Sequence, residues 1–596
     1  MPVIRRKLLS FSFSGKRNHG SLDLIEAPLE ELFDAFEAEF RGSRLQLITG
    51  LADGADQIAS SLFIKHEDRK GPKNSTRFLG AVLPLGREQY LETIEDRECF
   101  KRLYEKSHYR LELDGSGGHR SADIDFKDAY RQQARVLPRL CDVFIAVASR
   151  AEEGAKGGTK EAILAALVLN KPVAFLNLDD LQFYFYRSTE EWVYSLNGPM
   201  TAGDIVRGCT LIFHKEINSP FDRPRKDVYY RLRRWIWNQY ERWYKEEPAG
   251  KDATTLHTGM SDQFFSRMQD HRKRVSEISK YFMFQYRGGY LLSYFLALVA
   301  IFIAVDTSTV HLWKKEIVGI SESMAEIWLI CFGILKIVVI LLIIGNTDKV
   351  NKKQYNAKAI KYRYAAERLR TAAYLSIFGM VKIPGPFVGN HVEKHLKVYP
   401  GEAIFRKITS QLIIQFKLYL VIDRAYLLKA ARFVKEEWLK GQLAYYKKDS
   451  VKMQAIDKSL MAIPKKLGYI VLAIVVAEII ETLLPEAIRG KTGNLILWLV
   501  PVLVGITILL PGIITTVNIV HFQSEARRLA FRNVLMVDQL ERVIKRLDEA
   551  IKRIEREDCG SHLLGVLSIL EEAASLTTDE VAEWTMIYEK AVPDAG

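Results

Sequence analysis

Three glycine-containing loops near the start of the chain carry the residue types that bind phosphate and ribose groups. The first lies in "SFSGKRNHG", where an apolar run stops at Ser14 and Gly15. Lys16, Arg17 and Asn18 follow at once and offer positive charge and hydrogen-bond donors. Residues of these types, placed directly after a strand, are suited to holding a phosphate or a ribose.

The second loop lies in "LITGLADGADQIAS", where another apolar run ends and a helical pattern resumes. Gly50, Gly54 and Ala55 have small side chains that let a ligand come close to the backbone. Asp53 is placed to cap the following helix, and Asp56 is placed to accept a hydrogen bond from a ribose hydroxyl. This pattern is typical of a nucleotide-binding turn.

The third loop lies in "EEGAKGGTKEAI", after the apolar run "DVFIAVA". Gly157, Gly158 and Thr159 stand directly before a helical pattern, so the first N–H groups of that helix would favour an anion. A glycine at one strand-to-helix turn is often only a tight turn. Three such loops in one module predict a nucleotide site.

The pattern around these loops predicts a doubly wound parallel sheet over residues 1–180. Strands are predicted at 8–13, 44–49, 77–83, 141–148 and 172–176, and helices at 28–40, 53–66, 88–106, 124–140 and 159–170. The strands are short and apolar without polar alternation, as in sheets covered on both faces. The loops at their carboxyl ends would then meet at one edge.

Five motifs of this region resemble, in order, those of the SLOG superfamily, which includes LOG-type hydrolases, Smf/DprA proteins and nucleotide sensors of bacterial defence systems. They are "FSGKRNH", "ITGLADGADQIA", "AVLPLGREQY", "DAYRQQARVLPRLCDVFIAV" and "GGTKEAILAALVLNKPV". The resemblance implies a Rossmann-like nucleotide-binding domain. It carries ligand contacts over to Gly15, Lys16, Arg17, Gly50, Ala52, Gly54, Asp56, Gly157, Gly158 and Thr159.

The third loop departs from the hydrolase branch of that family. The branch has a glutamate three residues after the threonine, where this chain has Ala162, and Glu161 comes one position too early. The proline before the loop is also missing. The departures favour sensing over hydrolysis, so no catalytic residue is assigned, while Glu161 stays a candidate ligand contact.

Four apolar stretches in the second half predict membrane-spanning helices, at 288–305, 327–346, 467–484 and 495–520. Lys336 and Glu478 lie inside two of them, where charge is costly, and are candidates for a membrane pathway. Basic segments before 288 and after 346 predict that both termini and residues 350–465 are cytosolic. We therefore expect a multi-pass protein of the bacterial inner membrane.

The net charge and the spacing of the cysteines limit the classes of partner that we expect. The net charge of +13 is explained by the basic flanks of the spans, so nucleic acid is not expected as a partner. The five cysteines lie far apart without a CxxC pair, and no metal site is predicted. The expected partners are the lipid bilayer, a nucleotide second messenger and further copies of the chain.

The membrane half is predicted to be duplicated, because each pair of spans is followed by a charged helix, and it resembles the SLATT membrane effectors that accompany SLOG domains. The fold class is thus α/β plus membrane all-α. The predicted divisions are 1–180 for the sheet domain, 181–255 for an aromatic and basic helical connector, 260–380 for the first pair of spans, 381–465 for a cytosolic helical segment, 466–550 for the second pair and 551–596 for a helical tail.

The leading hypothesis is a nucleotide-sensing effector that permeabilises or depolarises the membrane in antiphage defence. The resemblance supplies the defence context, and no cofactor is expected beyond a nucleotide-type ligand such as an ADP-ribose derivative or a cyclic nucleotide. Two alternatives stay open. One is a membrane-anchored nucleotide N-glycosidase or phosphoribohydrolase that uses Glu161 or Asp56, and the other is a constitutive ion channel.

Overall fold

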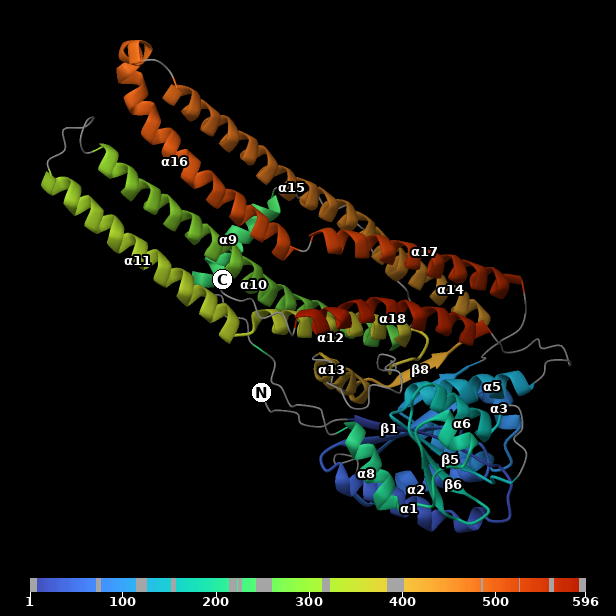
Figure 1. Cartoon of the computed structure of the whole chain (residues 1–596). Coiled ribbons are helices and arrows are strands. Elements are labelled where there is room, and N and C mark those ends of the chain that lie inside the picture. Colours follow the sequence, from blue (N-terminus) through green and yellow to red (C-terminus); the bar gives the residue numbers. More distant parts are fainter. Residues whose placement is uncertain are drawn as a thin grey trace.

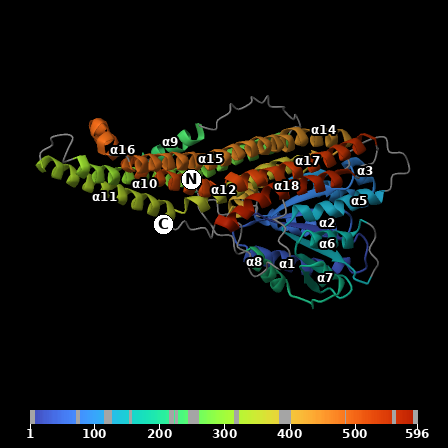
Figure 2. The same ribbon diagram turned by 45° about the horizontal axis from the view of Figure 1, so that its top comes forward.

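A mixed sheet stands at one end of the molecule and a bundle of long helices at the other (Figures 1 and 2). The computed structural model describes residues 8–70, 77–113, 126–151, 157–213, 222, 228–242, 260–313, 322–382, 401–483, 486–524, 526–556 and 562–588. The α/β unit and the helical part that the sequence predicts are both present.

Within the described residues, the sheet has eight strands in the order β7-β6-β5-β1-β2-β3-β4-β8, and only β7 runs antiparallel to its neighbour. They are β1 (Leu8–Gly15), β2 (Arg44–Thr49), β3 (Arg77–Leu83), β4 (Tyr109–Glu112), β5 (Val143–Ala148), β6 (Val173–Asn177), β7 (Phe183–Tyr186) and β8 (Leu418–Val421). Phe11 of β1 pairs with Leu47 of β2 on one side and with Val143 of β5 on the other. The strand order therefore reverses between β1 and β5.

Helices cover both faces of the sheet. They are α1 (Glu26–Glu39), α2 (Ala55–Lys70), α3 (Arg87–Glu92), α4 (Arg97–Lys106), α5 (Phe126–Val136), α6 (Thr159–Val168), α7 (Thr189–Val193) and α8 (Ala202–Phe213). Phe33 and Phe36 of α1 pack on Phe63 of α2 and on Phe11, with ring centroids 5.1 and 4.7 Å apart. The five predicted strands and the predicted helical segments are confirmed to within a few residues, whereas β4, β7 and β8 were not predicted.

Strand β8 corrects the prediction that residues 381–465 are wholly helical. It pairs in parallel with β4, so that Tyr109 faces Leu418 and Glu112 faces Val421. The chain before it is held to the sheet as well, because the Tyr109 hydroxyl donates to the Gly379 carbonyl at 2.8 Å. Similarly, β7 extends the sheet beyond residue 180 into the segment predicted as a helical connector.

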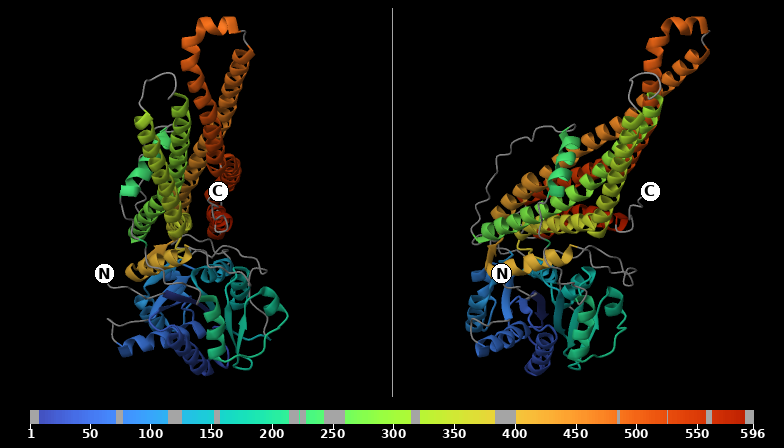
Figure 3. Two further views of the ribbon diagram at one scale, coloured as in Figure 1. Left: turned by 60° about the vertical axis from the view of Figure 1, so that its left-hand side comes forward. Right: turned by 90° about the vertical axis from the view of Figure 1, so that its left-hand side faces the viewer.

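Four of the remaining helices are long and apolar enough to cross a membrane, as the sequence predicts. The remaining helices are α9 (Val228–Arg242), α10 (Met260–Trp313), α11 (Glu322–Lys352), α12 (Tyr355–Ser376), α13 (Glu402–Gln415), α14 (Arg424–Val434), α15 (Lys440–Leu483), α16 (Glu486–Ser524), α17 (Ala526–Arg556) and α18 (His562–Tyr588). The apolar spans belong to α10, α11, α15 and α16, which point away from the sheet (Figure 3). Ile337 and Leu472 on these helices are 60% exposed, as expected of side chains that face lipid.

The sheet and the helical part share one hydrophobic core. A single cluster of buried side chains includes Leu111 and Phe144 from the sheet, Leu369 from α12 and Leu570 from α18. Arg139, just after α5, also pairs with Glu571 of α18 at 2.7 Å. The two parts are therefore packed as one body rather than tethered by a linker.

The bundle next to the sheet is held together at one buried carboxylate. Glu580 of α18 accepts hydrogen bonds from Tyr446 of α15 and Arg532 of α17, and Arg363 of α12 lies 3.5 Å away. The side chain of Glu580 is 2% exposed. Helix α12 follows α11, α17 follows α16, and α15 itself contains an apolar stretch. Helices connected to three of the apolar stretches thus meet at Glu580.

We expect Glu580→Leu to lower the free energy of unfolding by about 3–5 kcal/mol, because two arginines lose the buried carboxylate that they share. Denaturant titration of the detergent-solubilised protein measures the change. The matched control is Glu572→Leu, which removes a half-exposed pair with Arg546 and should cost at most about 1 kcal/mol. Equal losses in both variants would show that Glu580 does not hold the bundle.

Candidate functional site

The loops after β1 and β5 meet where the strand order reverses. Ser14 lies 3.2 Å from Thr159, hydroxyl to hydroxyl, although the two are 145 positions apart in the chain. In open sheets with parallel strands, ligands bind beyond the carboxyl ends of the strands at such a reversal. The structure thus brings the first and third predicted loops together at the edge where a ligand is expected.

The second loop packs against the first. Gly54 has a φ of +79°, and a Cβ there would lie 2.0 Å from the carbonyl oxygen of Arg17. The Ala55 amide donates to the Lys16 carbonyl at 3.1 Å. We predicted that these small residues let a ligand come close to the backbone. In the structure, the neighbouring loop occupies that space at Gly54 and Ala55. A larger side chain at Gly54 would displace both loops.

Asp56 lies beneath these loops and not at their surface. The residue is 5% exposed, and its Oδ1 accepts a hydrogen bond from the Gly15 amide at 2.9 Å. Burial raises the pKa of Asp56 to about 6, against the opposing effect of hydrogen bonds from Thr49 and Gly15. Its carboxylate orients the first two loops, which is a positioning role and differs from the ribose contact that we predicted.

Asp53 also has a different partner from the predicted one. Its carboxylate accepts hydrogen bonds from the backbone amides of Glu95 and Asp96, at 3.0 and 3.1 Å. The second loop is thereby tied to the segment that begins α4. Ala52 and Gly50 lie in the same loop, Ala52 partly exposed and Gly50 buried against Gln133.

Arg17 of the first loop is held in place by Tyr130. Its Nη2 donates to the Tyr130 hydroxyl at 3.0 Å, and its guanidinium lies 5.2 Å from the centre of the Tyr130 ring. Arg17 and Lys16 remain partly exposed, and Asn18 is exposed. A stacked guanidinium with donors left for an anion is a common phosphate contact.

Tyr90, in "AVLPLGREQY", is a further candidate residue that was not predicted. It is fully buried, and its hydroxyl has no hydrogen-bond partner among the described residues. Burial raises its pKa well above the usual value, so the hydroxyl stays protonated and able to donate. Its ring packs between Phe100 and Tyr130, at 5.8 and 6.4 Å. A buried donor without a partner next to the Arg17 pair is unusual and calls for a ligand or water.

The third loop is described only in part, since residues 152–156 lie outside the described chain. Gly157 has a φ of +78° and packs on the backbone of Tyr130 and Arg131, and Gly158 precedes the first turn of α6. Glu161 accepts from the Gly157 amide at 2.9 Å and pairs with Arg135 at the same distance. Burial alone would raise the pKa of Glu161, but these partners outweigh it and lower the pKa.

Arg150 closes the other side of the third loop and was not predicted. Its guanidinium donates to the Tyr186 hydroxyl at 2.6 Å and to the Trp192 carbonyl at 2.7 Å. Its backbone amide donates to Asp179 at 2.8 Å. No local sequence signal marks this arginine, because its partners come from β7 and α7, which were not predicted as part of the sheet unit.

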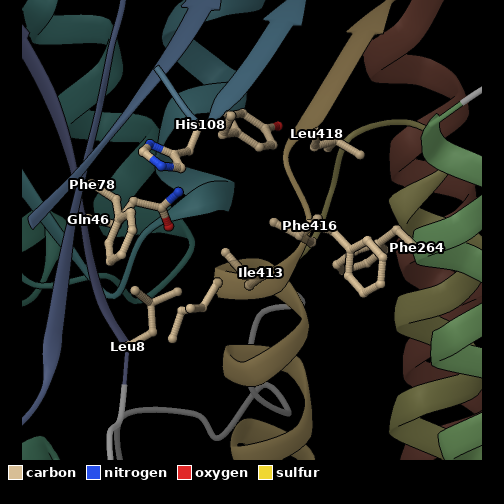
Figure 4. Close-up of a pocket in the computed structure, with 11 residues that line it drawn as sticks. Leu8, Gln46, Phe78, His108, Phe264, Ile413, Phe416 and Leu418 are labelled. Atoms are coloured by element: carbon tan, nitrogen blue, oxygen red, sulfur yellow. The ribbon is translucent and has the colours of Figure 1, made fainter. Parts of the chain in front are cut away.

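A small cavity lies at the opposite end of the strands (Figure 4). Leu8 and Phe78 from the sheet face Ile413 and Phe416 from the segment that leads into β8. The cavity has a volume of about 10 Å³, which is room for one water and far too little for a nucleotide. It is a packing gap at the joint between the sheet and the helical part.

The two candidate residues of the membrane pathway differ in what the structure describes. Lys336 is partly buried in α11, and no carboxylate among the described residues pairs with it. Glu478 lies in α15, but its side chain is outside the described part. The described residues contain no group of three or more metal-ligating side chains that could hold a metal ion.

The raised pKa of Asp56 predicts a pH dependence. The folded pKa of Asp56 lies above the ordinary 3.8, so folding favours the protonated carboxyl. The contribution of this carboxyl to the free energy of folding is complete below pH 3.8 and is lost as the pH rises to about 6. We expect the free energy of unfolding, measured relative to Asp56→Asn, to fall by about 2–3 kcal/mol across this window. Denaturant titrations at a series of pH values test this.

Glu161→Gln is the control of opposite sign. The folded pKa of Glu161 is lowered, so its contribution is present above the ordinary value of 4.5 and is lost as the pH falls. A difference between wild type and Asp56→Asn that does not change with pH would contradict the buried position of the Asp56 carboxyl.

No protein-family model matches this chain, and no curated protein matches it. The three loops, their buried donor and the place of this edge in the sheet are the features that indicate the class of ligand.

Proposed function

We propose that the protein is a nucleotide-sensing membrane effector. Its α/β unit, Rossmann-like in its strand order, binds a nucleotide-derived second messenger at the loops after β1, β2 and β5. Binding rearranges the apolar helices, and the bacterial inner membrane leaks or depolarises, which halts a phage-infected cell. The main support for the proposal is strand β8, which joins the sheet that bears the loops to a candidate membrane helix without a break.

The chemistry of the edge suits a phosphate-containing ligand. Arg17 is held on Tyr130 with donors to spare, and Lys16 lies next to it. The Tyr90 hydroxyl supplies a further donor once a ligand reaches it. These features fit an ADP-ribose derivative or a cyclic nucleotide, which presents phosphates and ribose hydroxyls together.

A chain of contacts leads from this edge to the membrane helices. The Arg87 amide, at the start of the helix that bears Tyr90, donates to the Glu112 carboxylate at 2.8 Å. The same carboxylate accepts from the Tyr419 hydroxyl of β8 at 3.1 Å. After β8, the Asp423 side chain caps α14, which continues through a π-helical turn (Lys435–Leu439) into α15 (Figure 1). A shift at α3 can thus be passed to a membrane helix.

Binding without hydrolysis is favoured over the enzyme alternative. An N-glycosidase that used Glu161 would need this carboxylate at the ligand, yet it is engaged by Gly157, Arg131 and Arg135. Asp56 is buried beneath the loops and bonded to the Gly15 amide. A constitutive channel remains the second alternative, and no described contact favours it over a gated one.

The proposal includes a homo-oligomer and an orientation. Lys336 is a charge in an apolar helix, and such a charge is costly unless it meets water or a partner. A second copy or a shared water-filled path provides either. Basic residues on the sheet side of α10 and α11 favour a cytosolic sheet unit and cytosolic termini.

Tyr90→Phe tests the ligand site most sharply. Removing a buried hydroxyl without a partner should leave the protein as stable as wild type or more so. If the hydroxyl serves a ligand, affinity for the cognate nucleotide should nevertheless fall, by roughly 2–10-fold. Arg17→Gln should lose roughly 10–100-fold, because a charge-assisted contact is removed.

Calorimetry with ADP-ribose and with cyclic nucleotides measures the affinities. Arg207→Gln is the matched control, since this exposed arginine of α8 pairs only with Asp204 among the described contacts. If both site variants bind the nucleotide as tightly as wild type does, the nucleotide does not bind at this edge of the sheet. Release of free base from the nucleotide would move the function to the enzyme class.

Coupling is tested by inserting two glycines between Ile422 and Asp423. The insertion leaves β8 free to pair but removes the rigid connection to α14, so nucleotide affinity should persist while nucleotide-triggered leakage from dye-loaded liposomes is lost. The same insertion after Gly198, around which a Cβ would meet nothing within 4 Å, is the control and should preserve both. Leakage that is equal with and without nucleotide in the wild type would indicate a constitutive channel.

A further inference from the structure

Helix α9 lies outside the sheet unit and is fastened to the first pair of membrane helices by a buried arginine. Arg233 is fully buried, and its guanidinium donates to Gln285 of α10 at 2.7 Å and to Asn346 of α11 at 2.6 Å. A Cβ at Gly288 would lie 2.5 Å from the Arg233 carbonyl oxygen. The backbone of α9 therefore rests directly on α10, which only a glycine at this position permits.

The position of this contact along α10 and α11 places α9 at a bilayer surface. Gly288 begins the apolar stretch of α10, and Asn346 comes at the end of the apolar stretch of α11. Asn346 also donates to the Gly289 carbonyl at 2.7 Å, so the two boundaries are level. Since the apolar stretches fill the hydrocarbon core, their shared boundary marks the headgroup region. Figure 1 shows α9 crossing α10 rather than running along it.

The outward face of α9 is basic, aromatic and apolar. Arg231 and Arg234 are exposed, Trp235 is 59% exposed and Leu232 is 42% exposed. The two arginines and Trp235, with Tyr230 and Asn238, line a shallow hollow of about 410 Å³. None of the five lining residues is acidic. Arg234 is preorganised here, because it donates to the Tyr230 hydroxyl at 3.2 Å.

We propose that this face of α9 binds the headgroups of anionic phospholipids in the leaflet nearer the sheet. The guanidiniums of Arg231 and Arg234 take the phosphate, and Trp235 lies at the headgroup level, where indole rings collect. Leu232 enters the boundary of the acyl chains, as in helices that lie in a membrane interface. The site is separate from the nucleotide loops and acts on the membrane part directly.

A lipid suits this face better than a nucleic acid, which could also use arginines and aromatic rings. A strand of nucleic acid needs a track open to solvent over several nucleotides. Here the track would run along the boundary of the apolar helices, where headgroups already stand. The place of α9 in the fold thus decides between two ligands that share phosphate chemistry.

Native mass spectrometry of the full-length protein in neutral detergent tests the proposal, with phosphatidylglycerol and phosphatidylcholine as the added lipids. Wild type should bind phosphatidylglycerol in preference to phosphatidylcholine. The double variant Arg231→Gln with Arg234→Gln should bind phosphatidylglycerol roughly 25-fold more weakly, about fivefold for each arginine. Arg231→Lys with Arg234→Lys keeps the charge and should retain most of the binding.

The matched control is Arg97→Gln with Lys101→Gln, which removes two exposed charges from α4 of the sheet unit. It should bind both lipids as wild type does. Equal phosphatidylglycerol affinity in wild type and in the α9 glutamine variant would overturn the proposal. So would glycerol phosphate binding as tightly as phosphatidylglycerol, a preference for a single-stranded oligonucleotide, or a change of subunit number in the glutamine variant.

Discussion

The pairing of β8 with β4 is the contact on which the rest of the molecule depends. It joins residues such as Glu112 and Tyr419 that are 307 positions apart in the chain. Once β8 is the edge strand, the chain that follows it must leave from the carboxyl edge of the sheet, and Asp423 starts α14 there. The direction of α14 and α15, and the shared core beneath them, follow from this one backbone register. A soluble domain on a flexible linker would place no such demand on its membrane helices.

The candidate site is built from loops that rest on one another. Asp56 holds the Gly15 amide from below, and Gly54 fits against the Arg17 carbonyl. Small residues in this candidate site thus serve internal packing first, and the partly exposed Arg17 guanidinium is what remains to face a ligand. A preorganised site of this kind loses little conformational entropy when a ligand binds. It can also transmit small displacements, since a packed loop has few ways to yield.

Elements with strong local patterns could be predicted from the sequence, and those that depend on distant partners could not. The apolar strands β1, β2, β3, β5 and β6 and the four apolar helices follow from composition and period alone. Strand β8 has four residues, "LYLV", between helical patterns, and only the exposed edge of β4 makes them a strand. The loops were found by their glycines, but the burial of Asp56 and of Tyr90 depends on packing between separate helices, which no local spacing records.

The late position of β8 in the chain has a consequence for biosynthesis. The ribosome completes β4 long before it reaches residue 418, so the edge of β4 stays unpaired while α10 and α11 are made. An open strand edge invites pairing with another chain. The first pair of apolar helices is therefore made while the sheet is still unfinished. A delay in the synthesis of residues 418–421 would leave the unpaired edge of β4 open to other chains for longer.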